Sequence, residues 1–83
     1  MEVRWGEKLV DRLITEQGDR TDEQYAGFLG VSRGTWSLVR RKKLQPDSRK
    51  FIPAVMRAYK SNEEITTLAI KALMEKESAN ANR

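Results

Sequence analysis

The chain has 83 residues, a formal net charge of +4, and neither cysteine nor histidine. It is long enough for one small domain, and the missing residue types argue against a disulfide framework, an enzyme, a metal site or another cofactor, with no small-molecule ligand expected. No apolar run approaches the roughly 18 residues of a membrane span and no signal-peptide core is present, so we expect a cytoplasmic protein without a membrane partner.

The apolar spacing predicts helices along the chain, and no run alternates as a strand does. The first amphipathic helix covers about residues 4–17, with apolar side chains three and four positions apart at Leu9, Val10, Leu13 and Ile14. Gly18 follows its last turn. Thr21 and Gln24 form a capping-box pattern for a second helix at about 22–29. Gly30 ends that helix, because glycine adopts a positive φ at little cost.

The third and fourth helices are marked by a cap and by a proline. Ser32 is a suitable N-cap for a third helix that runs to about Lys43. Residues 44–47 form a connector. Pro53 must lie in the first turn of the fourth helix, where its missing N–H costs nothing, so that helix begins near Phe51 or Ile52.

Asn62 is the predicted cap of a fifth helix, whose apolar face comprises Ile65, Leu68, Ala69, Ala72 and Leu73. Residues 78–83 are polar, and we predict a flexible tail there. The sequence therefore predicts an all-α domain of five helices over residues 1–77.

The positive charge is concentrated in the middle of the chain. Residues 32–60 contain nine lysines and arginines against Asp47 alone, a balance of +8. Residues 1–31 have four basic against seven acidic residues, and residues 61–83 have three against four. A basic stripe on a near-neutral domain suits a polyanion, because each neutralised phosphate releases counterions. A solvated basic face without a partner is the alternative.

The segment 22–43 combines two features of crossed helices. A small residue, Ala26, lies where the second helix must let the third approach, and Gly30 lies at the turn. Five apolar positions suited to sealing the crossing accompany them: Tyr25, Leu29, Val31, Trp36 and Val39. With these features the segment resembles the helix-turn-helix of phage repressors and Cro, the Xre-like family. The matching residues are Ala26, Leu29, Gly30, Val31, Ser32, Thr35, Trp36, Ser37 and Val39.

The resemblance extends over about residues 7–60, since Phe51, Ile52, Pro53, Val55 and Ala58 are similar to the fourth helix of lambdoid repressors. It implies a lambda-repressor-like domain of five helices. The chain departs from the family pattern at three places. The loop 18–20 is one residue longer than usual, and Arg20 replaces an apolar residue, so the hydrophobic staple must rely on arginine methylenes. Residues 40–43 (Arg-Arg-Lys-Lys) are more basic than the usual ending of the third helix.

The resemblance also implies a function: a sequence-specific regulator of transcription, of the phage or plasmid repressor type, that binds double-stranded DNA. The second helix would cross the DNA backbone and the third would lie in the major groove. Arg33 is the main candidate for base contact, since a guanidinium can bond guanine O6 and N7 together; contact with phosphate is its alternative. The candidate base-contacting residues are Arg33, Ser37, Leu38, Gly34, Ser32 and Arg41.

A second set of basic residues is expected to contact phosphate and so to position the domain without selecting sequence. Its members are Lys42, Lys43, Arg49, Lys50 and Arg40. Gly34 has a purely structural alternative as a helix-weakening residue. Leu38 has one as a semi-buried or partner-facing residue. The spacing of Trp5 and Trp36 points them inward, which favours core packing over stacking on bases.

Protein interaction is the alternative function, as in antitoxins or anti-repressors of similar shape. The fifth helix has Ile70 and Met74 off its main apolar stripe. They can form a homodimer seam, a groove for another partner or part of a longer core helix. We expect a homodimer, at least on DNA, because one short recognition helix contacts too few bases to be selective. Its seam is expected on the fifth helix, through Leu68, Ala72 and Leu73 or through the neighbouring Ile70 and Met74.

Overall fold

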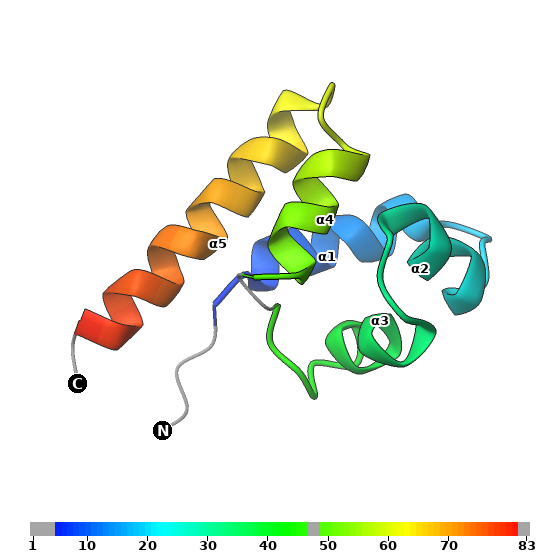
Figure 1. The fold of residues 1–83 in the computed structure, drawn as a ribbon, viewed down its shortest axis with the longest axis horizontal. Helices are drawn as coiled ribbons and strands as arrows, with labels where there is room; N and C mark the ends of the chain where they lie inside the picture. Colours follow the sequence, from blue (N-terminus) through cyan, green and yellow to red (C-terminus); the bar gives the residue numbers. More distant parts are fainter. Residues whose placement is uncertain (1–4, 47–48, 82–83) are drawn as a thin grey trace.

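The structure is a computed structural model that describes residues 5–46 and 49–81. That part of the chain contains five α-helices and no strand: α1 (Glu7–Gln17), α2 (Asp22–Leu29), α3 (Arg33–Arg40), α4 (Phe51–Ala58) and α5 (Glu63–Ala81). The predicted all-α class with five helices is confirmed. In Figure 1, α5 lies on the left flank, α3 lies at the lower edge, and α1 and α4 lie in the centre.

Three helices begin at the side-chain caps that the sequence predicts. Thr21 Oγ1 accepts from the backbone N–H of Gln24 at 3.1 Å, and Gln24 Oε1 accepts from the N–H of Thr21 at 3.0 Å, which completes the capping box. Ser32 Oγ and Asn62 Oδ1 each accept from the N–H three residues ahead, at 3.1 and 3.0 Å. Each cap satisfies an N–H that the first helical turn leaves without a partner.

The turn between α2 and α3 has the geometry expected of its glycine. Gly30 adopts φ +87°, and its N–H donates to the carbonyl of Ala26 at 2.8 Å. The N–H of Val31 donates to the same oxygen at 3.0 Å. Ala26 itself is 1% exposed, in agreement with its predicted place where the two helices pack together.

Helix α1 begins at Glu7, later than predicted, because Gly6 adopts a left-handed φ of +74°. The N–H of Gly6 donates to Glu75 Oε2 on α5 at 3.1 Å. A Cβ at this position would lie 3.1 Å from Pro46 Cγ and 3.3 Å from Ala72 Cβ. Glycine is therefore required by both the backbone conformation and the close packing. The predicted first residue of this helix, residue 4, lies outside the described residues.

Helix α3 ends at Arg40, so its predicted continuation to Lys43 is wrong. Lys42 adopts a left-handed φ of +63°, which no helix continues. The N–H groups of Lys43 and Leu44 both donate to the carbonyl of Leu38, at 2.9 and 3.2 Å. The basic run after Arg40 therefore lies in a turn. Of the predicted connector 44–47, residue 47 lies outside the described residues.

Helix α5 continues to Ala81, so residues 78–81 are helical where we predicted a polar tail. Residues 82–83 of that tail lie outside the described part of the chain. The helix packs against α1 and α4 through its predicted apolar face, where Ile65, Ala69 and Ala72 are at most 1% exposed.

The core lies between all five helices and is centred on Trp36, which is fully buried. Its ring meets Tyr25 edge-on at 4.9 Å and lies parallel to Phe51 at 6.3 Å. Aromatic pairs in such geometries contribute about 0.5–1.5 kcal/mol beyond their buried area. Trp5 is half-buried, and its Nε1 donates to the carbonyl of Pro46 at 3.1 Å. Trp36 therefore packs in the core, as predicted, whereas Trp5 is half-buried and lies outside the buried core cluster.

We predict that Ala26→Leu lowers the stability of the fold. The side chain is fully enclosed, and overpacking of this kind costs about 1–3 kcal/mol. The melting temperature should fall by roughly 4 °C or more. Gly27→Ala is the matched control on the same helix, because no atom lies within 4 Å of the added Cβ, and its melting temperature should be unchanged or higher. Equal melting temperatures for wild type and Ala26→Leu, followed by circular dichroism, would contradict the tight crossing.

Candidate nucleic-acid interface

One face of α3 is exposed along its length. Arg33, Gly34 and Leu38 are exposed, Ser37 is half-buried, and Arg41 is exposed at the C-cap. Leu38 leaves 44% of its surface accessible, so its semi-buried alternative is wrong. Residues four apart on a helix share a face, and this face is opposite the buried one that carries Trp36 and Val39. The structure thus gathers five of the six candidate base-contacting residues on one surface: Arg33, Gly34, Ser37, Leu38 and Arg41.

Ser32, the sixth candidate, is exposed but engaged in capping. Its hydroxyl oxygen accepts from the N–H of Thr35 at 3.1 Å. The same hydroxyl donates to Thr35 Oγ1 at 2.8 Å. Because its one proton is used within the protein, Ser32 can offer an outside partner only an acceptor.

The candidate phosphate-contacting residues fall into two groups. Lys43, Arg49 and Lys50 are exposed, on the turn after α3 and on the residues that precede α4. Lys50 lines a shallow hollow together with Ser32 and Thr35, which places the start of α4 beside the N-terminus of α3.

Arg40 and Lys42 form the second group, because each contacts a carboxylate on another helix, α2 or α1. Arg40 Nη1 lies 3.1 and 3.3 Å from the two carboxylate oxygens of Asp22. Lys42 Nζ lies 2.7 Å from Asp11 Oδ1. No local pattern indicates these two partners, which are 18 and 31 residues away along the chain.

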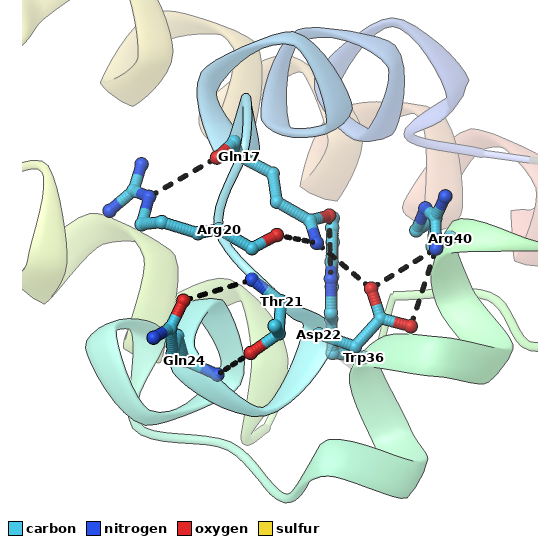
Figure 2. A network of polar contacts seen from close by, with 7 residues as sticks. All are labelled: Gln17, Arg20, Thr21, Asp22, Gln24, Trp36 and Arg40. Carbon is cyan, nitrogen blue, oxygen red and sulfur yellow. Dashed lines mark hydrogen bonds and ion pairs between the residues drawn. The ribbon is translucent and has the colours of Figure 1, made fainter.

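Gln17 connects the helices that carry these groups (Figure 2). The residue is 7% exposed, and its Oε1 accepts from the indole Nε1 of Trp36 at 3.1 Å. Its Nε2 donates to Asp22 Oδ1 at 2.9 Å and to the carbonyl of Arg20 at 2.8 Å. One amide at the end of α1 therefore bonds to the following loop, to the first turn of α2 and to α3.

The same network determines the charge state of Asp22. The hydrogen bond from Gln17 and then the charge of Arg40 hold the pKa of the Asp22 carboxyl below its usual range, against the opposing effect of partial burial. At neutral pH the side chain is thus an anion fixed at the junction of α1, α2 and α3. Tyr25, in the adjoining core, has a raised pKa because of burial and its 2.8 Å contact with the Tyr59 hydroxyl.

Arg20 takes the place of the usual apolar residue in a manner that the sequence did not predict. Its guanidinium covers the rings of Tyr25 and Phe28, with the central carbon 4.7 and 5.1 Å from the ring centroids. Its Nε and Nη2 donate to the carbonyls of Gln17 and Glu16 at the end of α1, at 3.2 and 2.6 Å. Arg20 thus makes a cation–π contact with these rings, which the sequence did not predict.

The described residues contain no group of three or more acidic side chains that could hold a metal ion. Among residues 5–46 and 49–81, even the 19-residue helix α5 lacks the apolar character that a membrane-spanning helix needs. Comparison of the chain with protein-family models, with curated proteins and with solved structures finds no match.

Proposed function

We propose that this protein is a sequence-specific, double-stranded DNA-binding regulator of the repressor type, and that α2 and α3 act as its helix-turn-helix. The observation that carries the proposal is the exposed face of α3, where Arg33, Ser37 and Leu38 stand side by side on a helix that a buried tryptophan holds to the core. Exposed basic residues flank this face on the turn that follows α3 and before α4.

The roles of the individual residues follow from their chemistry. Arg33, in the first turn of α3, offers a fork of N–H donors that matches the two acceptors of guanine. Ser37 can donate to or accept from a base edge, and Leu38 can contact a thymine methyl group. Gly34 has no side chain and permits close approach of the helix to the groove. Lys43, with Arg49 and Lys50, is assigned to phosphate.

The DNA-bound form is proposed to be a homodimer. Of the residues considered for a seam on α5, Ala72 is buried and Leu68 and Leu73 pack against the core. Ile70 and Met74, four residues apart on one face, leave 45% and 63% of their surfaces exposed. A second copy is the proposed occupant of this face, because two recognition helices on a two-fold axis provide the selectivity that one short helix lacks.

Binding to duplex DNA should weaken steeply with salt. Three exposed phosphate candidates in each of two chains neutralise about six phosphates, which gives a slope near −5 in a plot of log affinity against log salt concentration. Fluorescence anisotropy with a labelled random-sequence duplex measures this slope. A flat titration, or no binding to duplex at low salt, would reject the DNA-binding function and leave the exposed apolar residues of α5 to a protein partner.

Arg33→Ala and Lys43→Ala should impair DNA binding in different ways. Loss of a bidentate contact with guanine should cost about 1–3 kcal/mol on the selected site and little on random duplex. Loss of a phosphate contact should weaken both equally and reduce the salt slope by about one unit. The selected site comes from enrichment of a random duplex pool by the wild-type protein. If Arg33→Ala weakened both duplexes equally, Arg33 would be a phosphate ligand.

The enriched site should contain two half-sites with centres about 34 Å apart, and sedimentation of the complex should show two chains per site. Met74→Gln should reduce this stoichiometry, because it removes an exposed apolar side chain from the proposed seam. Lys71→Gln is the control, because this exposed residue of the same helix is polar and its replacement removes no apolar side chain from the seam. One wild-type chain per minimal site would contradict the dimer.

A further inference from the structure

We propose that the carboxylates of Asp22 and Asp11 are internal competitors of phosphate, which lower the affinity of this protein for duplex DNA of any sequence. They do so by engaging Arg40 and Lys42, the two basic residues that bracket the C-terminus of α3. The inference rests on the proposed DNA-binding function and identifies residues that set its balance between base contacts and backbone contacts.

The Asp22 carboxylate is held in place before any ligand arrives (Figure 2). Gln17, itself buried, donates to Asp22 Oδ1 at 2.9 Å, so the carboxylate is oriented by a side chain that cannot swing into solvent. The guanidinium of Arg40 then approaches both carboxylate oxygens, at 3.1 and 3.3 Å. A DNA phosphate would offer Arg40 the same kind of paired oxygen acceptors. The carboxylate thus engages Nη1, one of the donors that a phosphate ligand of Arg40 would use.

A second pair repeats this arrangement with residues from other parts of the chain. Lys42 Nζ contacts Asp11 Oδ1 at 2.7 Å, and Asp11 belongs to α1. The left-handed backbone of Lys42 places it in the turn after α3 rather than on the helix. Two of the four residues of the basic run 40–43, Arg40 and Lys42, therefore contact acidic residues of the protein's own surface.

These pairs are suited to competition because they are partly exposed. The side chains of Arg40 and Asp22 are 44% and 23% accessible, and those of Lys42 and Asp11 are 35% and 68% accessible. Exposed ion pairs add little to the stability of a fold. The basic side chains can therefore leave their carboxylates without unfolding the protein. A basic side chain that must first leave its carboxylate nevertheless contributes less to phosphate binding than an unpaired one. Because this loss does not depend on sequence, the base contacts of α3 make up a larger share of the affinity for a selected site.

The test compares three substitutions that each remove one negative charge. Asp22→Asn and Asp11→Asn release a basic side chain, whereas Asp19→Asn alters an exposed loop residue that makes no ion pair in the described part of the chain. Their affinities for a random-sequence duplex are measured between about 50 and 200 mM salt. We expect Asp22→Asn and Asp11→Asn to bind about two- to five-fold more tightly than Asp19→Asn. Their salt slopes should be steeper by about one unit for each chain bound.

A double-mutant cycle tests whether the tighter binding of Asp22→Asn arises from Arg40. In an Arg40→Gln background, Asp22→Asn should give no tighter binding than Asp19→Asn does, because no guanidinium remains to be released. This inference alone would be overturned if the wild type bound duplex but neither Asp22→Asn nor Asp11→Asn bound it more tightly than Asp19→Asn. Failure of wild type and all variants to bind duplex at low salt would overturn the proposed function and this inference with it. The Asp11 side chain is exposed, so Asp11→Asn should not lower the stability of the fold. It therefore tests the inference even if Asp22→Asn lowers the melting temperature.

Discussion

The buried indole N–H of Trp36 requires an acceptor, and the arrangement of the first three helices depends on how that requirement is met. An unsatisfied buried donor costs about 1–3 kcal/mol. Gln17 provides the acceptor at 3.1 Å, which fixes the last turn of α1 against the middle of α3. The amide then has two N–H donors to satisfy, and it uses them on the following loop and on Asp22. No side-chain N or O atom that is fully buried in the described residues lacks a partner. The outward direction of α3 is thus a consequence of satisfying one buried polar group.

Local signals predicted most of the fold, since caps and helix-ending glycines act within a few residues. Thr21, Ser32 and Asn62 cap as expected, and Gly30 ends α2. The helix ends that were predicted wrongly depend on contacts with distant residues or on a backbone conformation that no local signal indicates. Helix α1 begins at Glu7 because Gly6 is bonded to Glu75, 69 residues away. The run from Arg40 to Lys43 consists of good helix formers, so nothing local indicates the positive φ at Lys42. At the other end of the chain, residues 78–81 continue α5, and the two alanines among them favour a helix although the segment as a whole is polar enough to have predicted a frayed tail.

The candidate site also combines features that local signals predict with features that they do not. Helical periodicity alone places Arg33, Ser37 and Leu38 outward once Trp36 is inward, and the structure agrees. Periodicity is silent on how basic side chains are shared between an external ligand and the protein itself. The partners of Arg40 and Lys42 come from α2 and α1, and only the packing of those helices brings them near. A count of positive charges therefore overstates what the middle of the chain can offer to a polyanion.

The two tryptophans lie in different surroundings, so their intrinsic fluorescence reports on two different parts of the protein. Trp36 is fully enclosed, and its emission is sensitive to the seam where α1, α2 and α3 meet. Trp5 is half-buried over the segment before α4, with Lys76 Nζ 5.8 Å from its ring. Its emission is sensitive to whether α5 is docked. Replacing either indole by phenylalanine leaves a single tryptophan, so that loosening of α3 and undocking of α5 become separately visible without a label.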